Sequence, residues 1–129
     1  MDVSNSATVY VVDDDDAVRD SLRSLLESHG LTVQDYASAD DFLTDRQQPK
    51  AGCLLLDLHM PGMTGLQLLC KLRKDCSRLP VIVITGRSNP TLNQQIAQAG
   101  VFAMLEKPTN DEVLLWTIRG GLTAQPPAD

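Results

Sequence analysis

The sequence predicts a doubly wound α/β fold, in which five parallel strands in the spatial order 2-1-3-4-5 alternate with five helices. The first observation is that five short apolar runs recur at intervals of about 20 to 30 residues. Three of them are nearly continuous in Val, Ile, Leu or Cys, which is typical of strands buried on both faces of a parallel sheet. The second observation is that segments of helical period separate the runs. Right-handed crossovers leave few topologies, and this strand order is common at such a length.

The first half of the chain is expected to hold two strands and two helices. The strand Thr8–Val12 is followed by a helix with one apolar stripe, which consists of Val18, Leu22, Leu25 and Leu26. Asp16 suits the N-cap of this helix, and Gly30 its C-terminal end. The segments Leu31–Gln34 and Ala39–Gln47 are the second strand and the second helix.

The second half is expected to hold three strands and three helices. The strands are Cys53–Leu56, Val81–Ile84 and Val101–Leu105. The helices are Gly65–Asp75, a segment with the stripe Leu92, Ile96 and Ala99 that ends at Gly100, and a last segment with Val113, Leu114 and Ile118. Asn110 or Thr109 suits the N-cap of the last helix, and Trp116 is expected to lie in the core.

Composition and charge limit the classes of function. A chain of 129 residues with 43% hydrophobic residues can bury a core as one domain. We expect this domain to comprise residues 7–122, between a flexible N-terminus (1–6) and a linker-like tail (123–129). A net charge of −6 argues against a basic face that binds nucleic acid or an anionic membrane.

Cellular location is also predicted from the sequence. The first six residues lack the basic and apolar regions of a signal peptide, and no apolar run is long enough to cross a membrane. Three cysteines, with no Cys-x-x-Cys pair, indicate reduced thiols in a cytoplasmic protein. Of these, Cys53 and Cys70 are expected in the core.

Residues that can bind a ligand or take part in a reaction follow four of the predicted strands. Because functional groups in such folds gather at the carboxyl ends of the strands, these residues are expected to converge. They are Asp13 and Asp14, Asp57, Thr85 and Gly86, and Lys107.

The converging groups predict a phosphoryl-transfer site. Three adjacent carboxylates repel one another, and a set of oxygen ligands favours Mg²⁺ over zinc. Lys107 supplies a positive charge opposite Asp57, while Thr85 offers a hydroxyl donor and Gly86 leaves space and a backbone N–H. The carboxylate of Asp57 is then the nucleophile that forms an aspartyl phosphate.

Four motifs resemble those of the two-component response regulator receiver domain, the CheY-like fold. They are Val11-Val12-Asp13-Asp14, the segment Leu56 to Gly65, Val83-Ile84-Thr85-Gly86 and Glu106-Lys107-Pro108. The resemblance covers Thr8 to Leu122. The Leu-x-Met-Pro-x-Met-x-Gly turn and the Ile-Thr-Gly triplet look most like the FixJ subgroup, in which a receiver precedes a DNA-binding domain.

The resemblance implies a role for each site residue. Asp57 accepts the phosphoryl group from a sensor histidine kinase, and Mg²⁺, which Mn²⁺ can replace, is held by Asp13, Asp14, Asp57 and the backbone carbonyl of His59. Thr85 and Gly86 bind the phosphoryl group, with Thr85 as the switch hydroxyl that moves toward it, and Lys107 pairs with it. His59 and Arg87 tune the lifetime of the phosphorylated state. Asp15 is expected at the edge of the cluster.

The resemblance also implies how such a domain acts. It is a signalling phosphoacceptor rather than a metabolic enzyme, and phosphorylation changes its conformation and favours a homodimer through the fourth helix, fifth strand and fifth helix. The output is expected to be transcription through a DNA-binding domain outside this chain. The alternative is a stand-alone receiver that acts through protein–protein contacts.

One position departs from the family pattern. The aromatic residue usually found three residues before the lysine is replaced by Met104. Phe102 is two residues earlier, so strand alternation places it on the same sheet face as Met104.

Two other classes fit the sequence less well. A haloacid-dehalogenase-like phosphohydrolase would carry Asp-x-Asp after the first strand and use it as the nucleophile, whereas Asp13 and Asp14 are adjacent. A flavodoxin-like FMN carrier would need a Ser, Thr and Gly loop there, and four aspartates would repel the phosphate.

Overall fold

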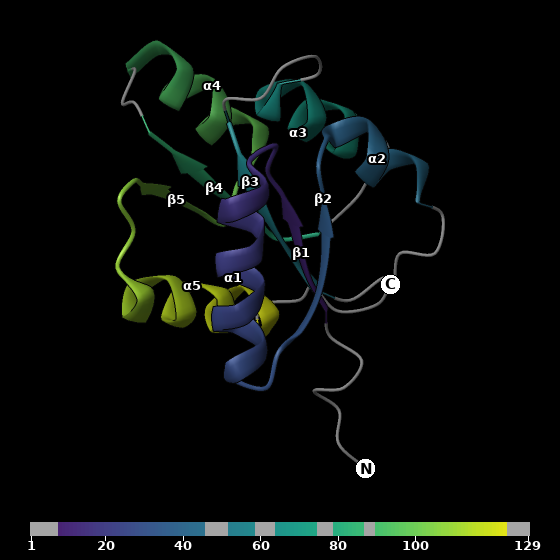
Figure 1. Ribbon diagram of the computed structural model, residues 1–129. Coiled ribbons are helices and arrows are strands. Elements are labelled where there is room, and N and C mark those ends of the chain that lie inside the picture. Colours follow the sequence, from purple (N-terminus) through teal and green to yellow (C-terminus); the bar gives the residue numbers. More distant parts are fainter. Residues whose placement is uncertain (1–7, 46–51, 59–63, 75–78, 87–89, 124–129) are drawn as a thin grey trace.

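The computed structural model describes residues 8–45, 52–58, 64–74, 79–86 and 90–123. Within these ranges strands and helices alternate along the chain, and the five strands form one parallel sheet in the order β2-β1-β3-β4-β5 (Figure 1). The predicted fold class is therefore confirmed. The elements are β1 (Thr8–Val12), α1 (Asp16–Ser28), β2 (Thr32–Tyr36), α2 (Ala39–Thr44), β3 (Gly52–Asp57), α3 (Gly65–Lys74), β4 (Val81–Thr85), α4 (Pro90–Ala99), β5 (Ala103–Glu106) and α5 (Asp111–Thr123).

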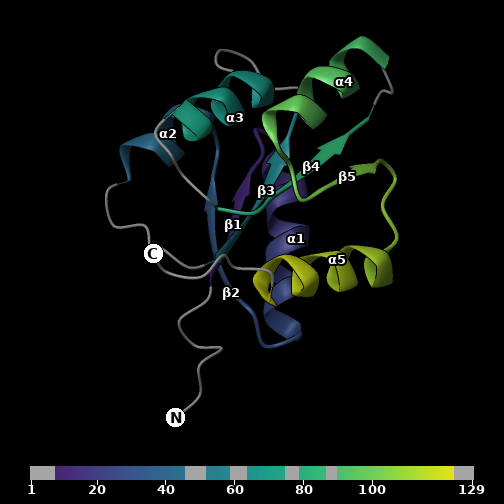
Figure 2. The same ribbon diagram turned by 180° about the vertical axis from the view of Figure 1, so that it is seen from behind.

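Helices cover both faces of the sheet. Helices α1 and α5 pack on one face, and α2, α3 and α4 on the other (Figures 1 and 2). In β1, Val9 and Val11 enter the core under α1 and α5, whereas Tyr10 and Val12 enter the opposite core. Every residue of β1, β3 and β4 is buried, which is why their sequences are apolar without alternation.

The start of α1 differs from the prediction by one residue. Asp15, and not Asp16, is the N-cap: its backbone is extended, and Oδ1 accepts hydrogen bonds from the amides of Ala17 and Val18. Asp16 is the first helical residue and pairs with Arg19 instead. The four consecutive aspartates offered several possible caps, and only the path of the chain out of β1 selects one of them.

The second strand and second helix differ slightly in extent from their predictions. Strand β2 continues to Tyr36 because its register with β1 pairs Val12 with that residue. Helix α2 begins after the N-cap Ser38 and ends at Thr44.

The start of α3 is held by a reciprocal pair of hydrogen bonds. The Thr64 amide donates to Gln67 Oε1, and the Gln67 amide donates to Thr64 Oγ1. This capping box fixes the first turn of α3 close to the end of β3. The helix begins at Gly65 as predicted and is described to Lys74.

The last strand is shorter than predicted, and Phe102 does not lie on the face expected for it. Phe102 lies in a bend before β5, where the bend interrupts the alternation of side chains. A β-carbon built on Gly120 of α5 would lie 3.3 Å from its ring, so Phe102 faces α5. Met104 packs on the opposite face, against the core under α3 and α4.

Of the two predictions for single residues of α5, one is confirmed and one is wrong. Asn110 is confirmed as its cap, because Oδ1 accepts from the amides of Glu112 and Val113. The prediction that Trp116 lies in the core is wrong, since the residue is 78% exposed. Leu114, Leu115 and Ile118 fill the core instead, and Trp116 falls on the outer side of the helix.

The cysteines are also divided between core and surface. Cys53 is fully buried, and burial raises the pKa of its thiol to about 12. Cys70 was predicted in the core but is exposed, because Leu68, Leu69 and Leu72 supply the buried face of α3. In the part of the chain that the structure describes, no helix is both long and apolar enough to cross a membrane.

Candidate functional site

Three carboxylates meet at the carboxyl ends of β1 and β3. Asp57 is the last residue of β3, and Asp13 and Asp14 directly follow β1, its neighbour in the sheet. One carboxylate oxygen from each residue lies within 4.8 Å of the other two. Asp13 and Asp57 are buried at 4% and 7% exposure, whereas Asp14 is exposed. The cluster therefore opens to solvent on the Asp14 side.

Backbone hydrogen bonds align the neighbouring strand ends with this cluster. The Leu58 amide donates to the Ile84 carbonyl (3.2 Å), and the Lys107 amide donates to the Thr85 carbonyl (2.8 Å). The buried Thr85 thus ends β4 beside the point where Lys107 leaves β5, and Gly86 follows it. The Nζ atom of Lys107 lies 3.7 Å from Asp57 Oδ1. The Lys107–Pro108 peptide bond is cis.

Gly65 allows α3 to begin against the strand that carries Asp57. Its amide donates to the Leu58 carbonyl (3.2 Å). A β-carbon built at this position would lie 2.9 Å from both the Asp57 carbonyl oxygen and Leu58 Cα, too close for any other residue without a backbone shift. Because residue 65 is a glycine, α3 can begin in direct contact with the backbone of Asp57.

The surroundings of Asp13 raise the pKa of its carboxyl above the ordinary value. Burial raises the pKa of this carboxyl first, and the charges of Asp57 and Asp14 raise it further. The hydrogen bond from the Asp15 amide and the charge of Lys107 act in the opposite direction but do not cancel the shift. Without a cation, one member of the cluster is thus biased toward protonation.

The donor set suits a hard divalent cation. All three side chains offer oxygen, the ligand type that Mg²⁺ prefers. Oxygens bound to one Mg²⁺ are at most about 4.2 Å apart, since each lies about 2.1 Å from the ion. The three carboxylate oxygens lie within 4.8 Å of one another. Among the described residues this cluster offers only carboxylate oxygens, whereas zinc favours His and Cys ligands. Asp13, Asp14 and Asp57 therefore fit the ion that the sequence predicted.

Comparison with known families identifies the family to which this fold belongs. Residues 9–119 match the family described as the response regulator receiver domain. The chain belongs to this family. The four motifs at the strand ends, which span residues 11–108, all lie within the matched residues.

Relatives of this receiver domain include transcriptional regulators. It is 41% identical over 117 residues to the transcriptional regulatory protein FixJ of Azorhizobium caulinodans, covering 91% of this chain and 56% of FixJ. It is 36% identical over 121 residues to the response regulator protein TodT of Pseudomonas putida, covering 94% of this chain and 53% of TodT. The chain spans about half the length of the curated relatives it matches. The resemblance to FixJ is confirmed.

The receiver domain also resembles FixJ in three-dimensional structure. The structure titled FixJ-N matches the receiver domain with a TM-score of 0.85 at 33% identity, over 95% of this chain and 98% of that chain.

The remaining predicted site residues fall outside the cluster or outside the described residues. Met104 is half-buried in β5 on the α4 side of the sheet. Asp15 serves as the cap of α1, so its Oδ1 is committed to backbone amides. His59 and Arg87 lie outside the residues that the structure describes.

One contact at the site was missed by sequence reasoning. Arg19 Nη1 donates to the carbonyl oxygen of Asp13 at 2.7 Å. The available signal was an arginine one turn beyond Asp16 in a helix that starts at the acidic run. Sequence alone could not distinguish this arginine from an exposed one.

Proposed function

We propose that this receiver domain is the phosphoacceptor of a two-component system, in which Asp57 accepts a phosphoryl group from a phosphohistidine of a sensor histidine kinase. The observation that supports this most is the placement of Asp57. Its carboxylate is buried, lies within 4.8 Å of two other carboxylates and is 3.7 Å from one ammonium group. Such a site neutralises a phosphoryl group while presenting an oxygen nucleophile.

In the proposed transfer, a carboxylate oxygen of Asp57 attacks the phosphorus atom in line with the P–N bond of the donor. A P–O bond forms as the P–N bond breaks, and the electron pair returns to the imidazole nitrogen of the kinase. Lys107 is close enough to pair with a phosphoryl oxygen once the acyl phosphate has formed. The domain is then a signalling phosphoacceptor and not a metabolic enzyme.

A divalent cation is part of the proposal, because carboxylates alone would repel the incoming phosphoryl group. Asp13, Asp14 and Asp57 would hold Mg²⁺, or Mn²⁺ in its place, together with the backbone carbonyl of His59. When bound, the ion supplies positive charge for the phosphoryl oxygens. The acidic side chains bind the ion and hold Asp57 beside it.

Phosphorylation is proposed to shift the domain between two conformations. Thr85 ends β4, its carbonyl bound to the Lys107 amide, and Gly86 follows it. In this proposal the Thr85 hydroxyl and the Gly86 amide bind the phosphoryl oxygens. A state in which Thr85 moves toward the phosphoryl group would rearrange the surface of α4 and β5. In this proposal His59 and Arg87 set how long the acyl phosphate survives.

An apolar groove between β5 and α5 supports the proposal of a homodimer. Its cavity volume is about 620 Å³, and its lining includes Phe102, Val113 and Trp116. These three side chains are 43%, 49% and 78% exposed. An exposed apolar surface of this kind is typical of interaction sites, and it supports the β5 and α5 part of the proposed α4–β5–α5 face.

The output is proposed to be transcription, through a DNA-binding domain that is not in this chain, in the cytoplasm. The relative FixJ supports this output, since it is named a transcriptional regulatory protein. The aligned regions cover 56% of FixJ and 53% of TodT, so both relatives are long enough to hold a further domain. The net charge of −6 of the whole chain argues against direct binding of DNA by the receiver domain itself.

The experiment is to incubate the protein with acetyl phosphate and Mg²⁺ and to record the intact mass. We expect the mass of one phosphoryl group to be added, and the addition to be lost in Asp57→Asn or when EDTA removes the cation. Asp41→Asn, which changes an exposed carboxylate of α2, is the matched control and should react like the wild type. Equal phosphorylation of Asp57→Asn and the wild type would overturn the proposal.

A further inference from the structure

Arg19 links the body of α1 to the backbone of the acidic cluster. From its position on the first turns of the helix it reaches back, and Nη1 donates to the carbonyl oxygen of Asp13 at 2.7 Å. The side chain is only 14% exposed. A hydrogen bond from a charged donor to a carbonyl is stronger than one from a neutral donor, particularly where water is largely excluded.

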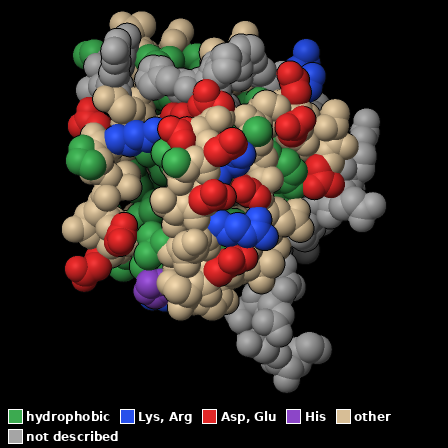
Figure 3. Space-filling model, in the orientation of Figure 1, with side chains coloured by type: hydrophobic (Ala, Val, Ile, Leu, Met, Phe, Trp, Pro, Cys, Tyr) green, Lys and Arg blue, Asp and Glu red, His purple; other side chains and the backbone are tan. Residues whose placement is uncertain are grey.

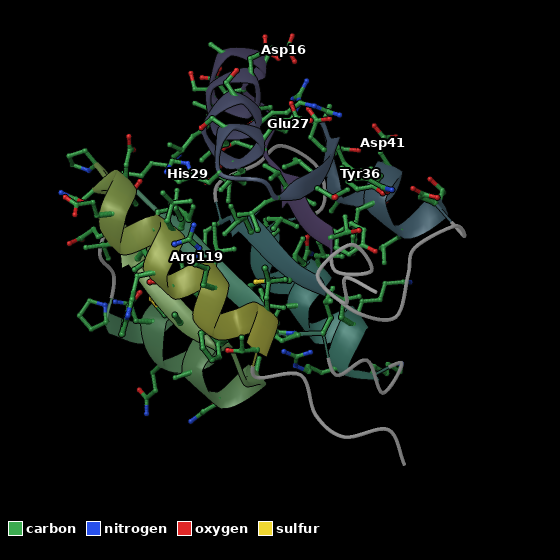
Figure 4. All side chains as sticks on the ribbon, turned by 90° about the horizontal axis from the view of Figure 1, so that it is seen from below. Asp16, Glu27, His29, Tyr36, Asp41 and Arg119 are labelled. Atoms are coloured by element: carbon green, nitrogen blue, oxygen red, sulfur yellow. The ribbon has the colours of Figure 1, made fainter. Side chains whose placement is uncertain are left out.

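Two carboxylates hold the guanidinium group in this direction. Nη2 of Arg19 pairs with Asp16 on the same helix, and Nε lies 3.4 Å from Asp35 Oδ2 on β2. Acidic and basic side chains are interspersed over the face that α1 presents in Figure 3. Figure 4 places Asp16 at the end of α1 opposite Glu27 and His29. Arg19 is in the first turn of α1, and its bond to the Asp13 carbonyl shows that this end of the helix adjoins the cluster.

Two further polar groups of Asp13 form hydrogen bonds as well. Its amide donates to the Tyr36 carbonyl (3.2 Å), and its Oδ1 accepts from the Asp15 amide (2.9 Å). The hydrogen bond from Arg19 holds the third group, the backbone carbonyl oxygen. With both ends of the residue held, the Asp13 carboxylate has little freedom to turn away from Asp57.

We propose that Arg19 is a positioning residue for the cation site: by holding the carbonyl of Asp13, it keeps the Asp13 carboxylate in place and strengthens the binding of Mg²⁺. This inference rests on the proposed function, because it assumes that the acidic cluster binds the ion. Groups that orient metal ligands through a hydrogen bond commonly contribute tenfold or more to metal affinity.

The direction in which Mg²⁺ affinity changes when Arg19 is replaced distinguishes a positioning role from a purely electrostatic one. Arg19 carries a positive charge close to a site for a cation. If the arginine acted only through its charge, its removal would tighten the binding of Mg²⁺. If it positions Asp13, its removal weakens the binding.

The test is a calorimetric titration of the unphosphorylated protein with MgCl₂, carried out on the wild type, Arg19→Gln, Arg19→Lys and Arg23→Gln. Arg23 is the matched control, since it lies one turn further along α1 and pairs with Asp35 and Glu27. We expect roughly tenfold weaker binding in Arg19→Gln. The Arg23→Gln variant should bind Mg²⁺ as the wild type does.

The variant Arg19→Lys distinguishes the effect of hydrogen-bond geometry from the effect of charge. It also provides a test if Arg19→Gln does not fold. It keeps the positive charge, but one ammonium group cannot reach Asp13, Asp16 and Asp35 in the same arrangement. We expect an affinity between those of the wild type and Arg19→Gln. Wild-type or tighter binding in both Arg19 variants would overturn the inference.

A second readout does not depend on the metal. Hydrogen exchange of the Asp15 amide, measured in EDTA, reports whether the loop around Asp13 stays ordered. We expect faster exchange in both Arg19 variants than in Arg23→Gln, and equal exchange would contradict the inference. If the wild type bound no Mg²⁺ while the exchange result held, the proposed function would fail and the positioning of Asp13 would stand.

Discussion

The Nζ atom of Lys107 lies 3.7 Å from Asp57 Oδ1, although β4 lies between β3, which ends at Asp57, and β5, which Lys107 directly follows. The Lys107 amide is bound to the Thr85 carbonyl, so the lysine side chain crosses the end of β4 to reach Asp57. Its head group provides the positive charge that opposes three carboxylates. This charge is placed where a phosphoryl group on Asp57 would need it.

Replacing this lysine should change the affinity for the cation. We expect Lys107→Met to bind Mg²⁺ severalfold more tightly than the wild type, because the cluster loses the positive charge that competes with the ion. Titration calorimetry with MgCl₂ measures the change. Weaker binding in this variant would show that Lys107 helps to build the cation site and does not merely balance its charge.

The carboxyl of Asp13 should make the metal-free protein less stable as the pH rises. Burial and the nearby carboxylates raise its pKa above the ordinary value of 3.8. The folded state therefore holds this proton more tightly than the unfolded chain does. Stability is lost as the pH rises from about 3.8 through the folded-state pKa.

The variant Asp13→Asn removes this loss, so its melting temperature in EDTA should exceed that of the wild type at pH 7. At a pH well below 3.8 the difference should shrink. The control is Asp41→Asn, whose carboxylate is exposed. If the melting temperatures of wild type and Asp13→Asn differed by the same amount at every pH, the Asp13 carboxyl would not be the cause.

Gly65 should tolerate no side chain. Gly65→Ala would place a β-carbon 2.9 Å from the Asp57 carbonyl oxygen, and the start of α3 would have to move. We expect a loss of about 1–3 kcal/mol in the free energy of unfolding. Gly86→Ala is the comparison, because a β-carbon there would meet Lys107 Cδ only at 3.9 Å. Urea titrations of both variants test this, and equal losses would contradict it.

Trp116 should matter for association and not for folding. Because the side chain is 78% exposed, we expect Trp116→Ala to change the free energy of unfolding by less than about 0.5 kcal/mol. The variant should still be phosphorylated by acetyl phosphate. Sedimentation velocity should find a dimer of the phosphorylated wild type and a monomer of the variant. Dimers of equal strength would place the interface elsewhere.

The fold and the core of the site were predictable because they depend on short-range sequence signals. Apolar runs identified β1, β3 and β4, which are buried on both faces. Parallel strands end at a common edge of the sheet. The residues that follow those runs, such as Asp13, Asp57 and Lys107, therefore had to meet once the strand order was fixed.

Other features depended on the detailed path of the chain. Which of four adjacent aspartates caps α1 is decided by the geometry of the exit from β1, and it is Asp15. The bend at Phe102 reversed the face expected from alternation. Trp116 is hydrophobic but lies on the outer side of a helix whose core positions are filled by aliphatic residues.

The central claim is that Asp57 carries the phosphoryl group, and reductive trapping tests it most directly. Borohydride reduces an acyl phosphate and leaves a homoserine, which mass spectrometry of the digested protein can assign to one position. After reaction with acetyl phosphate and Mg²⁺, we predict homoserine at position 57 and none when EDTA is present. Homoserine at another aspartate, or none in a folded protein that binds Mg²⁺, would contradict the account.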